Sequence, residues 1–365
     1  MNKKILVVTG TRPEIIKMAS ILNVLVQENI PFYFVHTGQH YDYFMSQVFI
    51  DALNLPRPNY NFFVKVPNPA AQTAKIMIRI GKFIAKSRPG ITLIQGDTNT
   101  ILATALASIK QNVPIGHVEA GLRSYDLRMQ EEHNRRLVDH ISALLFAPTE
   151  YNKQTLIKES VWGEIFVTGN TVIDACNQYI KIAEENSTIL ESIKFNEYVL
   201  ATFHRAENVD NKKMLKTFVD AFIESEVPIV IPLHPRTKKR LAENGLFNKF
   251  KNAKNIQIIP PANYFDNLVL MKHSKFIATD SGGLQEEATA PVIRKFVLIL
   301  RKSTERIEAI EAGFAKLVEL EKKKLIEELK DNFSKSHNLP NQSPYGDGNA
   351  GKKIVKHTVE YLQGV

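Results

Sequence analysis

The chain alternates short apolar runs with longer segments in which apolar residues recur at helical spacing. This alternation is typical of a parallel β-sheet whose two faces are covered by helices. In the first half, we expect strands at Lys4–Val8, Phe32–Val35, Ile91–Gln95, Val113–Val118 and Leu144–Ala147. We expect the helices between them at Pro13–Asn29, Ala74–Ser87 and Thr100–Gln111.

The same alternation begins again after a helix expected at Val172–Glu185. The further strands are expected at Tyr198–Thr202, Pro228–Ile231, Ile256–Ile259, Phe276–Ala278 and Phe296–Leu300. The pattern therefore predicts an α/β protein with two doubly wound, Rossmann-like domains and a cleft between them. In such sheets ligands bind beyond the carboxyl ends of the strands, so functional side chains should directly follow strands.

Length and composition agree with a soluble two-domain protein. The 365 residues are 44% hydrophobic, which is enough apolar material for two cores without a disulfide or a metal. Cys176 is the single cysteine, so no intrachain disulfide can form, as in a reducing cytoplasm. The apolar run near the N-terminus is too short for a signal peptide, and no run reaches the length of a membrane span. We expect a cytoplasmic protein with no membrane partner.

The net charge of +9 does not indicate nucleic-acid binding, because the basic residues are spread along the whole chain. The run Lys322–Lys324 stands among glutamates, as on a solvated helix face. No basic stripe is interleaved with aromatic residues. The excess of positive charge is compatible with a small phosphorylated ligand.

The segment Thr9–Glu14 follows the first predicted strand. Gly10 permits a tight turn, and Pro13 suits the first turn of a helix because that position needs no N–H donor. A helix N-terminus attracts anions, and Arg12 adds a guanidinium group for a phosphate or carboxylate. An ordinary turn with a solvated arginine explains the segment equally well, since it is neither a Walker loop nor a G-x-G-x-x-G motif.

Acidic residues follow the next strands. Asp97 can simply cap the following helix. Glu119 ends an apolar strand, where an unpaired carboxylate would be costly to bury, so either a cation such as Arg123 satisfies it or it faces a cleft. His117 points to the same side as Glu119 and is predicted to be a satisfied core histidine. The segment Gln130–Arg136 opens a polar helix, for which a solvated face is the simpler interpretation.

In the second half, the segment after the strand at 276–278 is the most specific. Ser281, Gly282 and Gly283 should expose backbone N–H groups as they lead into a helix, which is a way to bind phosphate. Glu287, one helical turn further, could accept hydrogen bonds from ribose hydroxyls. A glycine-rich turn with a capping Asp280 would not account for the two glutamates, so ligand binding is favoured.

His204 follows the first strand of the second half, where a phosphate or a proton transfer would need it. A loop histidine with one ordinary hydrogen bond is the alternative. The similar segment His234–Arg236 is predicted to be structural.

Taken in order, these motifs resemble the non-hydrolysing UDP-N-acetylglucosamine (UDP-GlcNAc) 2-epimerases over almost the whole chain. The matching segments are GTRPEIIKM, QGDTNT, GHVEAGLRS, EEHNR, FVTGNTVID, TDSGGLQEE, STER and SPYGDGNAG. The resemblance implies two domains of the glycosyltransferase-B type, at 1–170 and 171–349, with a C-terminal helix at 350–365 returning to the first. It also implies an active site in the interdomain cleft, a homodimer and a role in polysaccharide biosynthesis.

The resemblance further implies reversible epimerisation at C2 through elimination and re-addition of UDP, with neither a cofactor nor a metal. The implied acid–base residues are Asp97, Glu119 and Glu131, and His204 is implied to assist the departing diphosphate. The implied substrate-binding residues are Arg12, Lys17, Arg135, Ser281, Gly282, Gly283, Glu287 and Arg306. A slip of one position between Glu131 and Glu132 is possible.

Two segments depart from the family pattern. Ala288–Phe296 replaces a shorter Pro-Ser-Leu-Gly-Lys-Pro run, and His234–Arg236 replaces His-x-Asn-Pro. The second segment, together with Gln39–His40, puts activation by a second UDP-GlcNAc in doubt. The alternatives to a non-hydrolysing epimerase are a hydrolysing epimerase that releases N-acetylmannosamine (ManNAc), a glycosyltransferase, and a non-catalytic sensor of nucleotide-sugars.

Overall fold

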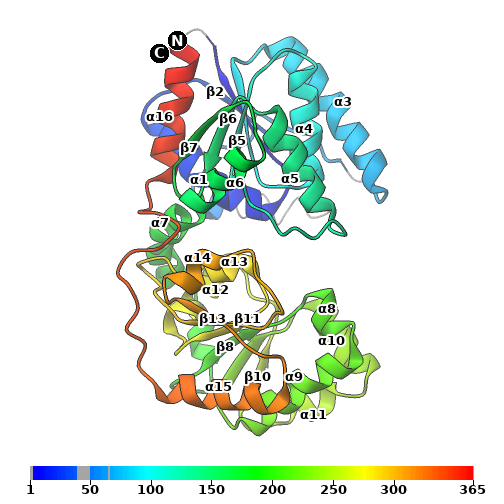
Figure 1. Ribbon diagram of the computed structural model, residues 1–365, viewed down its shortest axis with the longest axis vertical. Helices are drawn as coiled ribbons and strands as arrows, with labels where there is room; N and C mark the ends of the chain where they lie inside the picture. The colour runs from blue at the N-terminus through cyan, green and yellow to red at the C-terminus, as the bar shows by residue number, and fades with distance from the viewer. Residues whose placement is uncertain (1–2, 39–49, 65, 365) are drawn as a thin grey trace. The chain divides into compact units, whose positions relative to one another are not determined.

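The computed structural model describes residues 3–38, 50–64 and 66–364, so Gln39 and His40 lie outside the described residues. The chain divides into two compact units (Figure 1). The first consists of Met1–Ala175 and Tyr345–Val365, and the second of Cys176–Pro344. The sequence placed the two boundaries a few residues away, after 170 and after 349.

The described strands of the first unit form one parallel sheet of seven strands, in the order β3-β2-β1-β4-β5-β6-β7. The order reverses between β1 and β4, which is the topological switch point at which ligands bind in such folds. The strands are β1 (Ile5–Thr9), β2 (Phe32–His36), β3 (Tyr60–Asn61), β4 (Ile91–Gln95), β5 (Ile115–Val118), β6 (Leu144–Ala147) and β7 (Glu164–Val167).

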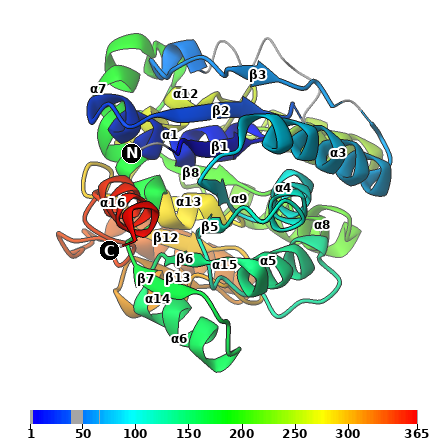
Figure 2. The same cartoon turned by 90° about the horizontal axis from the view of Figure 1, so that it is seen from above.

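Helices cover both faces of this sheet (Figure 2). On one face, Ile80, Ile101 and Val138 from three successive helices pack on strand residues such as Leu6. On the other face, the C-terminal helix packs against α1, and its His357 stacks on a phenylalanine of β7. The helices are α1 (Arg12–Gln27), α3 (Pro69–Ser87), α4 (Asn99–Ile109), α5 (Gln130–Ile141), α6 (Glu150–Lys158), α7 (Thr171–Asn186, which continues into the second unit) and α16 (Ala350–Gln363).

The second unit repeats this topology with six described parallel strands in the order β10-β9-β8-β11-β12-β13. Its switch point lies between β8 and β11. The strands are β8 (Val199–Thr202), β9 (Ile229–Pro232), β10 (Ile256–Ile259), β11 (Ile277–Thr279), β12 (Val297–Ile299) and β13 (Ala315–Leu317).

An aromatic cluster forms much of the core of the second unit, with Phe203 at the end of β8 surrounded by Phe218, Phe222 and Phe250. The helices are η1 (Ile189–Ser192, a 3-10 helix), α8 (Ala206–Val209), α9 (Lys212–Glu224), α10 (Pro235–Glu243), α11 (Phe247–Lys251), α12 (Tyr264–His273), α13 (Gly282–Glu287), α14 (Ile307–Glu311) and α15 (Lys322–Ser334).

The predicted fold class, two doubly wound α/β sheets, is confirmed. The sequence missed β3, β7 and β13, which are edge strands of their sheets. Throughout the described ranges, no helix has both the length and the apolar character needed to cross a membrane. Within the same ranges, no group of three or more His, Cys, Asp or Glu side chains is arranged to hold a metal ion.

Candidate functional site

The predicted site residues of the first unit gather at the carboxyl ends of β1, β4 and β5, on both sides of the switch point. Arg12 and Lys17 belong to the first turns of α1, which begins directly after β1. Asp97 lies between β4 and α4, and Glu119 directly follows β5. These residues therefore share one edge of one sheet, as the strand-end rule predicts.

Glu119 is held by two donors from neighbouring elements. Lys17 Nζ and Gln95 Nε2 each lie 2.5 Å from its Oε2. Its backbone has φ of 70°, in the left-handed region that residues other than glycine rarely adopt. Strained backbone of this kind clusters at functional sites, where surrounding contacts enforce it. The carboxylate is one-tenth exposed, so it is largely shielded from water but accessible.

The prediction that a cation satisfies Glu119 is confirmed, but the cation is Lys17 and not Arg123. The Arg123 guanidinium lies 2.7 Å from Asp139 and 2.6 Å from Glu159, on the buried side of the sheet. Asp139 also accepts a hydrogen bond from His117 Nδ1 at 2.7 Å. His117 is fully buried and donates through Nε2 to the carbonyl of Gly96 at 2.9 Å, so the prediction of a satisfied core histidine is confirmed.

Asp97 directly follows Gly96 and is therefore placed by this buried network. Its carboxylate forms an ion pair with Arg135 and remains about 29% exposed. Its carbonyl accepts a hydrogen bond from the Asn134 amide at 2.8 Å. Because both contacts come from α5, that helix fixes the backbone and the side chain of Asp97 together.

The structure separates the two adjacent glutamates of α5. Glu132 is fully buried and accepts hydrogen bonds from the Ser124 N–H at 2.8 Å and from Arg135 and Arg136 at 3.0 Å each. Burial alone would raise the pKa of Glu132, but the hydrogen bonds from Ser124 and Arg136 and the charge of Arg135 outweigh burial and lower it. Glu131 is exposed in the first turn of the same helix. Of the two, only Glu131 can reach a ligand.

Glu14 is a buried carboxylate at this edge that the sequence analysis missed. It accepts hydrogen bonds from the Gly10 N–H at 2.5 Å, the Thr11 N–H at 3.3 Å and the Thr98 hydroxyl at 2.7 Å. It therefore ties the loop after β1 to the loop that carries Asp97. The order Thr11-x-x-Glu14 is the capping-box signature, and this signal could have identified it. Burial raises its pKa to about 7, against the lowering effect of the hydrogen bond from Thr98.

This shift predicts a pH-dependent stability that Glu14→Gln should remove. Because the folded pKa of about 7 exceeds the ordinary value of 4.5, Glu14 binds its proton more tightly in the folded state. The resulting stabilisation is complete below pH 4.5 and is lost as the pH rises through about 7. We expect the stability of the native protein relative to Glu14→Gln to fall by roughly 2–3 kcal/mol over this range, measured by urea unfolding at several pH values.

The exposed Glu150 supplies the matched control for this measurement. Its side chain is 62% exposed on α6, so Glu150→Gln should follow the native pH profile throughout. Parallel profiles for the native protein and Glu14→Gln would show that Glu14 does not titrate in this range.

In the second unit, Asp280 organises the loop that carries His204. Asp280 is fully buried and accepts hydrogen bonds from the backbone N–H groups of His204 and Arg205 and from the Asn208 amide, each at 2.9 Å. It therefore joins the loops after β8 and β11 across the switch point, instead of capping a helix. The His204 side chain stays 39% exposed, with its Nδ1 3.4 Å from Asp280.

Arginine side chains converge beside the Ser281–Gly283 turn. Arg301, Arg306 and Arg205 surround Glu305, at 2.6, 3.1 and 3.6 Å respectively. Burial alone would raise the pKa of Glu305, but the charges of Arg306 and Arg301 outweigh burial and lower it to about 2. These guanidinium groups are paired with Glu305, Glu286 and Glu207, which hold them in place. Guanidinium groups held in this way can make bidentate contacts with a multivalent anion such as a diphosphate.

Arg306 also connects this cluster to the glycine turn. It donates to the buried Glu286 at 2.8 Å, and its Cζ would lie 3.3 Å from a Cβ at Gly282. The N–H of Ser281 donates to Thr279 Oγ1 at 2.9 Å, so Ser281 has its hydroxyl, and not its N–H, to offer a ligand. Glu287 is partly buried at the end of α13.

Arg205 and Arg301 were not among the predicted site residues. Both lie in the short segments that follow predicted strands, β8 and β12 respectively, so the rule used for His204 could have found them.

Comparison with known proteins identifies the family. The sequence profile described as UDP-N-acetylglucosamine 2-epimerase matches residues 24–358. The chain belongs to this family. The UDP-N-acetylglucosamine 2-epimerase of Methanocaldococcus jannaschii is 44% identical over 362 residues, which cover 97% of this chain and 98% of the relative. Membership in this family confirms the predicted enzyme class, an isomerase.

One relative is named for a different nucleotide-sugar. A UDP-2,3-diacetamido-2,3-dideoxy-D-glucuronate 2-epimerase of Pseudomonas aeruginosa is 33% identical, over 97% of this chain and 99% of the relative. Among solved structures, the M. jannaschii UDP-GlcNAc 2-epimerase in complex with UDP-GlcNAc and UDP superposes with a TM-score of 0.86 at 44% identity, covering 98% of this chain and 99% of that chain.

Proposed function

We propose that this epimerase interconverts UDP-GlcNAc and UDP-ManNAc without releasing the free sugar. The observation that carries the proposal is the set of carboxylates at the switch-point edge of the first unit: Asp97 beside Arg135 and Glu119 beside Lys17. Epimerisation at C2 needs a base to remove a proton and an acid to return one, and carboxyl side chains can perform either role.

In the proposed reaction, the C2–H bond and the bond from C1 to the UDP oxygen break, and a C1–C2 double bond forms. UDP leaves with the bonding electron pair, and a carboxylate takes the C2 proton. The reverse addition then delivers a proton to the opposite face of C2 and returns UDP to C1. Because the two proton transfers occur on opposite faces, two acid–base groups are required, chosen from Asp97, Glu119 and Glu131.

Lys17 and Arg135 contribute by their placement. The ammonium of Lys17 at 2.5 Å favours the carboxylate form of Glu119, the form that can accept a proton. Arg135 forms an ion pair with Asp97 and is itself held by the buried Glu132. In this proposal, Lys17 and Arg135 hold the two carboxylates in position, in addition to any contact with substrate.

The second unit is proposed to hold the diphosphate. Negative charge develops on the β-phosphate as the bond to C1 breaks, and fixed donors aimed at this charge stabilise the transition state. Arg306, Arg301 and Arg205 form such a set, with His204 on the neighbouring loop. Glu287 is proposed to accept hydrogen bonds from the ribose hydroxyls.

A second candidate substrate is the UDP-diacetamido-glucuronate for which the Pseudomonas relative is named. It undergoes the same change at C2 but carries an additional acetamido group at C3 and a carboxylate at C6. A higher kcat/KM for this nucleotide than for UDP-GlcNAc would replace the substrate in the proposal and leave the reaction type unchanged.

We also propose that the enzyme works in the cytoplasm as a homodimer. Cys176 is buried and is the single cysteine of the chain, so no intrachain disulfide can form, which fits a reducing compartment. Light scattering on the purified protein measures the oligomeric state directly, and a mass of 41.4 kDa would identify a monomer.

Proton NMR of the enzyme with UDP-GlcNAc in deuterated water tests the reaction. The expected product is UDP-ManNAc with deuterium at C2, because the proton removed from C2 exchanges with solvent before one is returned. Free ManNAc and UDP would establish hydrolysis instead. Unchanged UDP-GlcNAc would overturn the proposed substrate.

A further inference from the structure

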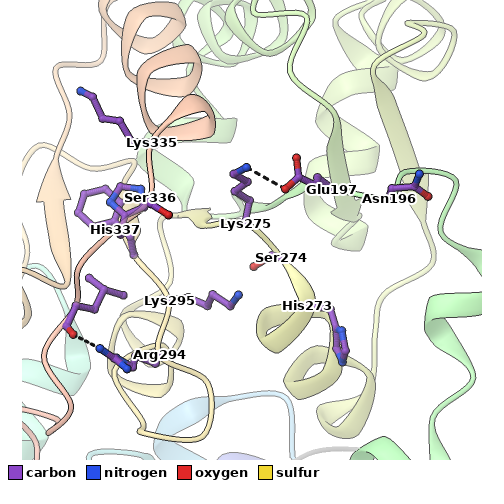
Figure 3. A pocket seen from close by; sticks show the side chains of 12 residues that line it. Asn196, Glu197, His273, Ser274, Lys275, Arg294, Lys295, Lys335, Ser336 and His337 are labelled. Atoms are coloured by element: carbon purple, nitrogen blue, oxygen red, sulfur yellow. Dashed lines mark hydrogen bonds and ion pairs between the residues drawn. The ribbon is translucent and has the colours of Figure 1, made fainter.

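A polar pocket of about 460 Å³ lies in the second unit (Figure 3). Its lining residues precede β8, β11 and β12 or follow α12 and α15. They therefore surround the amino-terminal ends of these strands. His204 and Ser281 follow the carboxyl ends of the same strands, so this pocket is separate from the proposed nucleotide loops.

The lining is strongly basic. Lys275, Arg294, Lys295 and Lys335 line the pocket, and Glu197 is the acidic residue among the described lining residues. Lys275 Nζ lies 2.9 Å from Glu197, and Lys335 Nζ lies 3.4 Å from Asp331. Carboxylates therefore compensate two of these four charges and leave those of Arg294 and Lys295. The pocket keeps an excess of positive charge.

Helix ends account for only part of this excess. Lys335 directly follows the end of α15, and His273 is the last residue of α12. Cations at these positions complement the partial negative charge of a helix C-terminus. Lys295 lies well beyond the end of α13 and directly before β12, so no helix end explains it.

Two lining groups lack partners. The half-buried Lys295 ammonium makes no hydrogen bond or ion pair with any side chain in the described ranges, and burial lowers its pKa. His337 stacks on Phe296 with ring centroids 4.2 Å apart, and its buried Nε2 has no hydrogen-bond partner among the described residues. Buried polar groups without partners are rare in native proteins and often mark the place of an ion or ligand.

We propose that this pocket binds a small multivalent oxyanion of the phosphate or pyrophosphate class. In Figure 3 the Lys275 side chain extends toward Glu197, and the Lys295 side chain enters the pocket from the neighbouring segment. Both side chains have long, flexible stems, so their ammonium groups can turn toward an anion bound between them. His337 can accept a hydrogen bond from a protonated phosphate oxygen or, when protonated, donate one. A polar, cationic lining is unsuited to an apolar ligand, and the volume is within the range of small-ligand sites.

The segment that departs from the family pattern builds part of this pocket. Arg294, Lys295 and Phe296 are the last residues of the altered Ala288–Phe296 run. Arg294 adopts φ of 50° and donates to the Leu339 carbonyl, which anchors the segment that carries Lys295.

Lysine acylation followed by peptide mass spectrometry tests the proposal on the full chain. A lysine with a lowered pKa is more often neutral and reacts readily with acetic anhydride unless a ligand shields it. We expect inorganic pyrophosphate to slow acylation of Lys295 severalfold, with Lys251 on α11 unaffected. Because the readout is Lys295 itself, binding of pyrophosphate near Ser281 does not produce it.

Three variants extend this test. Lys275→Ala removes one of the two ammonium groups and should raise the half-protective pyrophosphate concentration roughly tenfold, whereas Lys251→Ala should leave it unchanged. Lys295→Ala should melt at the native temperature, since its ammonium has no partner to lose. Unchanged acylation of Lys295, equal protection by sodium chloride at the same ionic strength, or native protection in Lys275→Ala would each overturn the proposal.

Discussion

Glu119→Gln is expected to lower kcat for epimerisation by about 10³-fold or more while leaving UDP affinity nearly unchanged. Glutamine keeps an oxygen that can accept from Lys17 and Gln95, so the shape and both hydrogen bonds at this position can persist. What is lost is the capacity to exchange a proton with C2. Steady-state kinetics with UDP-GlcNAc measure kcat, and isothermal titration with UDP measures affinity.

The matched control is Glu150→Gln, which alters an exposed glutamate of the same unit. It should retain native kcat and native UDP affinity. Retention of a tenth or more of native kcat by Glu119→Gln would remove Glu119 from the proposed acid–base group. An equal loss of kcat and of UDP affinity would instead identify it as a residue that maintains the shape of the site.

The sequence predicted the interior of each sheet because central parallel strands are buried on both faces. All residues of β4 and β5 are buried and most are apolar, and such short apolar segments are easy to detect. Edge strands lack this signal. β7 has exposed residues at both ends, β13 begins buried and ends exposed, and β3 contains only two residues. Their places in the sheet depend on long-range pairing that no local pattern encodes.

The location of the site could be predicted for the same topological reason, but the contacts of its side chains could not. Parallel strands bring their carboxyl ends to one edge, so residues after β1, β4 and β5 could be grouped in advance. The pairing of individual side chains could not be predicted. Lys17 and Glu119 are 102 positions apart in the chain, and Arg123, only four positions from Glu119, forms its ion pairs elsewhere. Such partners depend on how helices pack across the sheet.

The two adjacent glutamates of α5 should respond to mutation in opposite ways. Glu132→Ala removes a fully buried carboxylate and breaks its ion pair with Arg135. Breaking a buried ion pair from one side is expected to cost about 3–5 kcal/mol of unfolding free energy. Glu131→Ala truncates an exposed side chain, so it should cost less than about 1 kcal/mol but lower kcat by about 10²-fold or more.

Urea unfolding and steady-state kinetics on both variants separate these effects, because each variant serves as the control for its neighbour. Glu132→Ala should also lose activity, since Arg135 pairs with Asp97, but this loss should accompany a lower unfolding midpoint. Glu131→Ala should lose activity at a native midpoint. If Glu131→Ala instead retained native kcat, the proton returned to C2 would have to come from Asp97 or Glu119, and the proposed acid–base group would contain those two residues alone.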